Sequence, residues 1–234
     1  MEIQLDSKVK KNPVIIEGFP GLGLVSTIAT EFIIDHLNAK QIGKITGKEV
    51  PAIAAIHKGQ VIEPFGIFYA EKENILILRG IFPVRGGVET DLTAAIGELA
   101  KTLHADEIIS LEGLNASITK EPKAFYFSKN KNTETKFKSI KVGKMDEGIV
   151  LGLTAILLTK MPQTTFIFAE TQSEMPDSRA AAKIIEVLDK YLGLDIDYKP
   201  LLKKAEQLEN QVKDMLIKSM NAVKNKEQKE SYVG

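Results

Sequence analysis

Short runs of consecutive apolar residues, rich in isoleucine and leucine, alternate along the chain with longer stretches in which apolar residues recur every third or fourth position. The apolar runs are VIIE at 14–17, ILIL at 75–78, EIISLEG at 107–113 and TTFIFAE at 164–170. Such runs predict strands that are buried on both faces. The stretches with helical spacing lie at 22–37, 88–103, 147–160 and 177–192. The alternation predicts an α/β fold, a three-layer sandwich with a mostly parallel central sheet.

Weaker patterns occupy much of the remaining chain. Strand-like segments lie at 41–46, 52–56, 66–70 and 124–127. The polar segment 128–136, SKNKNTETK, predicts an exposed loop or the tip of a hairpin.

The composition changes after Tyr198, where apolar residues recur at near-heptad spacing in a polar background. These residues are Leu201, Leu208, Val212 and Met215. The stripe predicts a helix that packs against its own domain or against a neighbouring subunit, and we expect part of it at a homo-oligomer interface. We therefore divide the chain into an α/β core domain (1–197), a C-terminal oligomerisation or docking helix (198–222) and a mobile polar tail (223–234).

Charge and composition narrow the classes of function. The 31 basic and 31 acidic residues give no net charge, which argues against a nucleic-acid partner. The absence of cysteine excludes thiol catalysis, disulfides and cysteine-ligated metals. Residues 1–12 lack the apolar core of a signal peptide, and no apolar run is long enough to span a bilayer. We expect a cytoplasmic protein without a membrane partner.

The segment GFPGLGLVS at 18–26 leads from the first predicted strand into the first predicted helix. Gly21 and Gly23 approximate the glycine pattern of dinucleotide-binding loops, but Ser26 replaces the third glycine. Pro20 also lacks an amide hydrogen that could face a phosphate. We favour a structural strand-to-helix turn. The alternatives are a dinucleotide site and an unspecified anion site at the helix N-terminus.

The three arginines of the chain, Arg79, Arg85 and Arg179, lie close after predicted central strands. Ligands of open α/β sheets bind at the carboxyl ends of the strands, and arginine suits phosphate or carboxylate. We favour a bracing role, in which the arginines pair with acids on neighbouring loops. The acids available for this are Glu89, Asp91, Glu170 and Asp177.

If the protein is an enzyme, the glycine loop and the loop after ILIL are expected to form an anion-binding site together. Its candidate residues are Gly21, Gly23, Arg79, Arg85, Gly86, Gly87 and Glu170, with Glu170 on a sugar hydroxyl. The histidines, His36, His57 and His104, are isolated in sequence and predict no metal site. We identify no catalytic residue, no clear acid–base pair and no cofactor.

Several segments together resemble the proteasome assembly chaperone family in its archaeal branch. They are GFPGLGLVS, FPVRGG, ISLEGLN, GIVLGLTAILL, FAETQSEMPDSRAAAKIIEVLDKYLGLDID and LLKKAEQLENQV. The likeness runs from about residue 12 to 220 in the order that the family has. The resemblance implies a core related to the nucleoside phosphorylase and hydrolase fold, with no enzymatic activity. It also implies self-assembly into a ring or bundle, a ring of four or five subunits being one such form, and a role with the 20S proteasome.

Some members of that family end in a hydrophobic residue, a tyrosine and any residue, which insert between proteasome α subunits. This chain ends in Tyr232, Val233 and Gly234, so the tyrosine lies one position too early, and Ser231 precedes it. We therefore expect the folded body, rather than this degenerate docking tail, to bind free α subunits. A related family member is a further possible partner. The alternative hypothesis is a phosphorylase- or hydrolase-like enzyme that acts on a nucleoside or another small phosphate-linked substrate.

Overall fold

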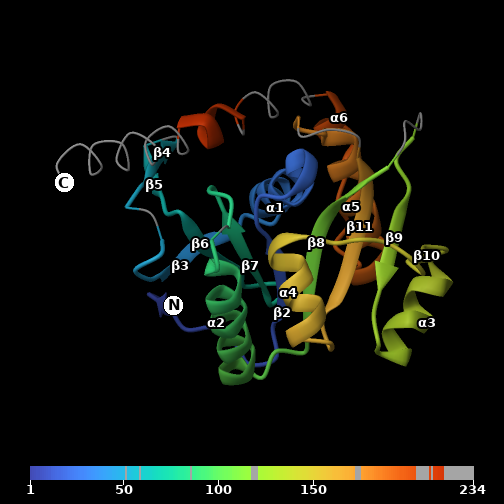
Figure 1. Ribbon diagram of the computed structural model, residues 1–234, viewed down its shortest axis with the longest axis horizontal. Coiled ribbons are helices and arrows are strands. Elements are labelled where there is room, and N and C mark those ends of the chain that lie inside the picture. Colours follow the sequence, from blue (N-terminus) through green and yellow to red (C-terminus); the bar gives the residue numbers. More distant parts are fainter. Residues whose placement is uncertain are drawn as a thin grey trace.

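The computed structural model describes residues 1–50, 52–57, 59–84, 86–116, 121–171, 175–203, 211 and 213–218 (Figure 1). A nine-stranded sheet forms the middle layer in the order β1-β3-β6-β7-β2-β8-β11-β9-β10. Its strands are β1 (Glu2–Leu5), β2 (Val14–Gly18), β3 (Lys40–Thr46), β6 (Phe65–Ala70), β7 (Ile75–Gly80), β8 (Glu107–Asn115), β9 (Ala124–Phe127), β10 (Gly143–Lys144) and β11 (Thr165–Thr171). A separate hairpin pairs β4 (Ala55–His57) with β5 (Gln60–Ile62).

The four predicted buried runs form the centre of this sheet. They are β7, β2, β8 and β11, which lie side by side and pair in parallel. Strands β6 and β9 flank them and pair in antiparallel orientation with β7 and β11. The carboxyl ends of the four central strands therefore meet at one edge of the sheet.

Helices cover both faces of the sheet because successive residues of each central strand point to opposite sides. In β2, Ile15 packs in the cluster that contains residues of α2 (Val88–Leu103) and α4 (Gly152–Lys160). The next residue, Ile16, packs in the cluster of α1 (Val25–His36) and α5 (Ser178–Leu192). Figure 1 shows α2 and α4 in front of the sheet and α1 and α5 behind it. The predicted three-layer sandwich is thus confirmed.

The prediction for the polar segment 128–136 was wrong, because most of it belongs to helix α3 (Lys131–Ser139). The side chain of Asn130 caps this helix by accepting hydrogen bonds from the amides of Asn132 and Thr133. One aromatic residue anchors the helix: Phe137 is fully buried and stacks between the rings of Tyr126 and Tyr191, with both centroid distances at 4.4 Å. Thr133 and Phe137 are the buried residues of α3, and only Phe137 is strongly apolar, so the segment shows no apolar pattern with helical spacing and the sequence did not reveal the helix.

The predicted helix at 147–160 begins later than expected, at Gly152. The residues before it form no helix, and Ile149 and Leu151 point into solvent. Their apolar character had extended the apparent helical pattern toward the N-terminus.

The C-terminal segments pack on the domain through part of the predicted stripe. Leu201 of α6 (Lys199–Lys203) is buried and joins the cluster of α1 and α5, as does Leu216 of the helical segment 213–218. Leu201 is therefore a core residue of this domain. Met215 is half-buried, and Leu208 and Val212 lie outside the described residues.

Candidate functional site

A pocket of about 650 Å³ opens at the carboxyl ends of β2 and β8. This is the edge where ligands bind in open α/β sheets. The glycine loop after β2, the end of β8, the start of α4 and the C-terminal segment all contribute to the lining. Of the described residues that line it, Glu17, Glu112 and Lys213 carry ionisable side chains.

Glu17, the last side chain of β2, is 2% exposed. Its Oε2 atom has no hydrogen-bond partner among the described residues. Burial raises the pKa of Glu17 to about 8, and the nearby carboxyl of Glu112 raises it further, whereas Ser110 and the backbone of Phe19 oppose the shift. At neutral pH this carboxyl is therefore mostly protonated.

Glu112 lies on β8 and is half-buried. Its Oε2 accepts a hydrogen bond from the hydroxyl of Thr154 at 3.0 Å, and its Oε1 accepts one from the amide of Gly113 at 2.9 Å. Burial raises the pKa of Glu112 to about 7, although these hydrogen bonds and one from the backbone of Leu22 act in the opposite direction. Glu112 therefore changes its charge near neutral pH.

The glycine loop is built around this carboxylate. A Cβ atom at Gly21 would overlap Oε1 of Glu112, and a Cβ atom at Gly113 would overlap the carbonyl oxygen of Leu22. The backbone of Leu22 faces Glu112 and lowers the pKa of this carboxyl, so a carboxyl group rather than an external anion lies at the loop. The geometry and charge of the loop thus disfavour a bound phosphate.

Gly23 supplies the turn from strand to helix. It has φ +63°, and an added Cβ atom would lie 2.6 Å from Oγ1 of Thr171. The turn contains the short helix η1 (Leu22–Leu24), and α1 follows directly. The carbonyl oxygen of Gly23 also accepts a hydrogen bond of 2.9 Å from the amide of Asp177, the N-cap of α5. These contacts agree with the structural turn that we favoured.

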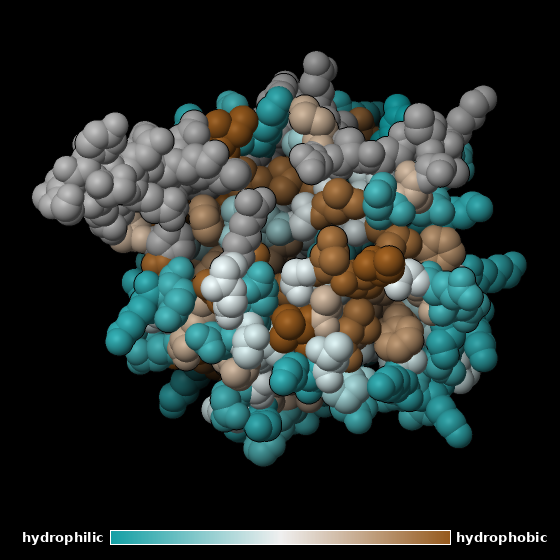
Figure 2. All heavy atoms as spheres, viewed as in Figure 1, coloured by the Kyte–Doolittle hydropathy of each residue, from teal (hydrophilic) through white to brown (hydrophobic). Residues whose placement is uncertain are grey.

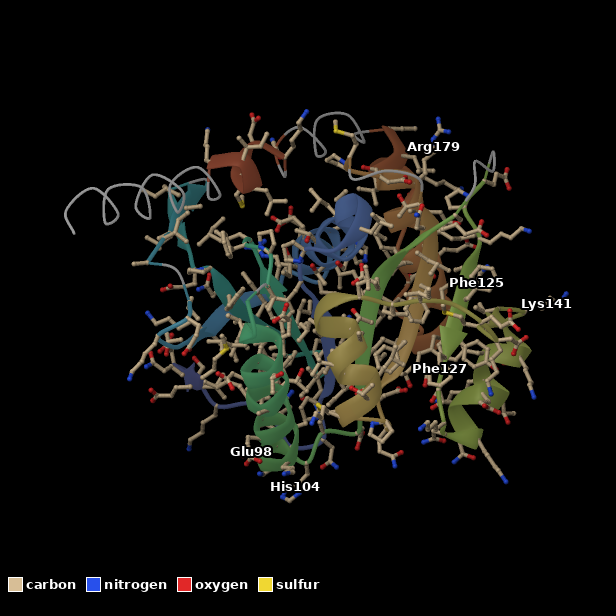
Figure 3. All side chains as sticks on the ribbon, in the orientation of Figure 1. Glu98, His104, Phe125, Phe127, Lys141 and Arg179 are labelled. Carbon is tan, nitrogen blue, oxygen red and sulfur yellow. The ribbon has the colours of Figure 1, made fainter. Side chains whose placement is uncertain are left out.

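The arginines do not converge on the pocket. Arg79 is buried, pairs with Glu31 of α1 and lies over the ring of Phe68 at 4.8 Å. Its role is thus bracing, but with an acid that the sequence argument had not named. Arg179 is exposed at the start of α5 (Figure 3), and Arg85 lies outside the described residues.

The remaining candidates of the anion site are also dispersed. Gly86 and Gly87 have positive φ angles of 74° and 89° ahead of α2, and the amide of Gly87 donates to Glu89. Oε2 of Glu170 accepts a hydrogen bond from the amide of Lys123. None of these three residues lines the pocket.

Exposed apolar residues surround the pocket. Ile149 is 85% exposed and Leu151 is 77% exposed, and Met175 and Ile217 are further exposed residues of the lining. Figure 2 shows hydrophobic residues gathered on the face that carries α4. We call Ile149, Leu151 and Met175 the apolar rim. Contiguous exposed apolar surface next to a pocket is typical of an interaction site.

The described part of the chain contains neither a cluster of metal-binding side chains nor a membrane-spanning helix. No group of three or more His, Asp or Glu side chains there is placed to hold a metal ion. No helix in the same ranges is long and apolar enough to cross a membrane.

The family model of the PAC2 family matches residues 15–216. The chain belongs to the PAC2 family. It is 32% identical over 215 residues to the uncharacterized protein MJ0106 of Methanocaldococcus jannaschii, covering 88% of this chain and 86% of that one. The family match covers most of the range, about residues 12 to 220, over which the resemblance was stated.

Two solved structures have the same fold as this chain. Pyrococcus furiosus PbaA, an archaeal homolog of proteasome-assembly chaperone, has a TM-score of 0.81 at 28% identity, covering 92% of this chain and 96% of that one. P. furiosus PbaB, an archaeal proteasome activator, has a TM-score of 0.75 at 22% identity, covering 91% and 97%. The first confirms the resemblance stated from the sequence motifs, and the second shows the shared fold.

The two pocket acids were not among the site residues predicted from the sequence. Each stands before a glycine in a buried strand, Glu17 in VIIEG and Glu112 in ISLEG. An acid in an otherwise apolar central strand, close to its carboxyl end, is the signal that could have revealed them.

Proposed function

We propose that this protein is a proteasome-assembly-chaperone-like protein that self-associates, binds proteasome α subunits and catalyses no reaction. The observation that carries the proposal is the likeness to PbaA, an archaeal homolog of proteasome-assembly chaperone, along nearly the whole of both chains. Membership of the PAC2 family supports it.

The apolar rim is the surface that we assign to the α subunit. Ile149 and Leu151 precede α4 and present side chains that no described part of the chain covers. Burying an exposed leucine or isoleucine in an interface contributes about 1.5–3 kcal/mol. A few such residues near the centre of an interface carry most of its binding energy.

A different surface is assigned to self-association. Leu202 is 45% exposed and Ile217 is 44% exposed, and each follows a buried neighbour, Leu201 and Leu216. In each C-terminal segment one residue, Leu201 or Leu216, packs against the domain, and the next residue, Leu202 or Ile217, is exposed to solvent. This exposed face differs from the predicted near-heptad stripe, whose first residue, Leu201, is buried in the domain.

The test is a pull-down of purified proteasome α subunits with the full chain, beside a native mass measurement. We expect retention of free α subunits and a homo-oligomer. The variant Leu151→Glu should abolish retention without changing the mass. Leu5→Glu, which alters an exposed apolar residue on the edge strand β1, serves as the matched control. Failure of the wild-type chain to retain any α subunit would refute the proposal.

A phosphorylase- or hydrolase-like enzyme is the second candidate, and the pair of pocket acids is the observation that favours it. Carboxyls with raised pKa values in a pocket are typical of acid–base catalysis. A phosphate-dependent reaction conflicts with the two carboxyl groups of the lining, one of which lies against the backbone of Leu22 in the glycine loop. We therefore expect inosine to release no free base with or without phosphate, and phosphate to leave the melting temperature unchanged. Base release by wild type but not by Glu17→Gln would establish the enzyme instead.

A further inference from the structure

The proposed function does not explain why a carboxyl is buried at the pocket without a complete set of partners. Glu17 is almost fully buried, yet its Oε2 atom has no hydrogen-bond partner among the described residues. An unsatisfied buried polar atom costs free energy that a ligand with a donor group would restore. Because Glu17 lines the pocket, a ligand there can supply that donor.

The rest of the lining defines the body of such a ligand. Apolar side chains of the glycine loop, α4 and β11 dominate it, among them Leu22, Leu153 and Phe168. A volume of about 650 Å³ falls in the range of small-molecule sites. The site therefore suits a compound with an apolar chain and one donor-rich end.

The charges that line the pocket determine which chemical group the donor-rich end of the ligand carries. Two carboxyls, Glu17 and Glu112, face the same space and disfavour an anion. Two carboxyl groups and one threonine hydroxyl are too few ligands for a hard metal ion, which takes six or more oxygens. An ammonium or guanidinium group carries several donors and a positive charge, and both features match.

We propose that the pocket binds an organic cation in which a primary ammonium or guanidinium group is attached to an apolar chain. The cationic end donates hydrogen bonds to Glu17 and Glu112, and the chain packs against Leu153 and Phe168. The rim residues border the same pocket, but the contacts proposed for the cation are made by other residues, so either assignment can fail without the other.

Binding of this kind is linked to pH. The cation favours the ionised forms of Glu17 and Glu112, so their pKa values, about 8 and about 7, fall when it binds, and protons are released. The affinity should therefore increase at least tenfold between pH 6.5 and pH 8.5, where an alkylamine is still protonated. Lys213 is the remaining charged residue of the described lining, and its like charge opposes binding. Replacing it in Lys213→Gln should strengthen binding.

The experiment is titration calorimetry of the full chain with hexylammonium chloride in two buffers of different ionisation enthalpy. Hexanol tests for apolar binding alone, and hexanoate tests for binding of an anion. Glu17→Gln should weaken hexylammonium binding at pH 8.5 at least tenfold. Glu98→Gln, at the far end of α2 in Figure 3, is an exposed control and should change nothing.

Proton release and binding that depends on Glu17 would support the proposal. Equal affinity for hexanol, binding of hexanoate, or no heat with hexylammonium at pH 8.5 would each overturn it. Glu112→Gln provides a second variant, because it should weaken binding while Thr154 and the amide of Gly113 still hold the side chain.

Discussion

Replacing Glu17 by glutamine should change the pH dependence of folding stability. Glutamine has nearly the same shape as a protonated glutamate, so it keeps the packing of β2. The folded-state pKa of about 8 lies above the ordinary value of 4.5, so the folded protein holds a proton that the unfolded chain has released. Stability is therefore lost as the pH rises from about 4.5 to 8, and no further loss from this group follows above pH 8.

The magnitude follows from the size of the shift. Each pKa unit corresponds to about 1.4 kcal/mol, so the wild type loses about 4 kcal/mol through Glu17 between pH 5 and pH 8. Glu17→Gln removes that loss because glutamine does not titrate. The variant should have nearly the wild-type stability at pH 5 and exceed it by several kcal/mol at pH 9.

Urea denaturation of the variant and the wild type at pH 5, 7 and 9, followed by circular dichroism, measures this difference. Glu2→Gln, which removes an exposed carboxylate from β1, should leave the wild-type curve unchanged. Parallel pH profiles for Glu17→Gln and wild type would refute the reasoning, because they would mean that Glu17 gains or loses no proton on folding.

Three further predictions concern the turn, the oligomer and the tail. Gly23→Ala should lower the free energy of unfolding by about 1–3 kcal/mol, because φ is positive at this residue and Thr171 occupies the space of the added methyl group. Gly97→Ala inside α2 is the control and should not lower it. Urea titrations of both variants measure the difference. Glutamate at both Leu202 and Ile217 should halve or further reduce the native mass while circular dichroism stays unchanged; an unchanged mass would contradict the assigned interface. Deleting residues 230–234 should barely alter retention of α subunits, and loss of retention would make the tail functional.

The central strands of the sheet were predicted correctly from the sequence, because each of them is marked by a pattern of neighbouring residues. Strands β2, β7, β8 and β11 are continuous apolar runs, and burial on both faces requires such runs. Strand order and the short edge strands β1 and β10 were not predictable in this way, because their pairing depends on partners far along the chain. The sequence did not reveal helix α3 for a related reason, because the stacking of Phe137 on Tyr126 and Tyr191 that helps to hold the helix forms only in the folded protein.

The site could be predicted only in part. The glycine turn followed from the residues, because Gly23 adopts a conformation that glycine favours. The sequence did not predict which group the loop packs against. That group is the carboxylate of Glu112, which belongs to β8 and lies about ninety residues further along the chain. Likewise, Arg79 on β7 pairs with Glu31 on α1, a contact between elements that are far apart in the sequence.

A comparison of two strand glutamates separates a structural acid from one that is available to a ligand. Glu107, at the start of β8, accepts hydrogen bonds from the hydroxyl of Tyr191 at 2.9 and 3.0 Å and another from Thr165. Its carboxylate is therefore satisfied within the protein, whereas Oε2 of Glu17 has no partner in the described part of the chain.

The two acids should consequently respond to the same substitution with opposite signs. Glu107→Gln loses charge-assisted hydrogen bonds and should lower the free energy of unfolding by about 1–3 kcal/mol at pH 9. Glu17→Gln relieves a buried charge and should raise it at that pH. Urea titrations of both variants at pH 9 test the contrast. If both variants lose stability there, Glu17 has a stabilising partner in the folded protein, and the pocket no longer needs a ligand to satisfy it.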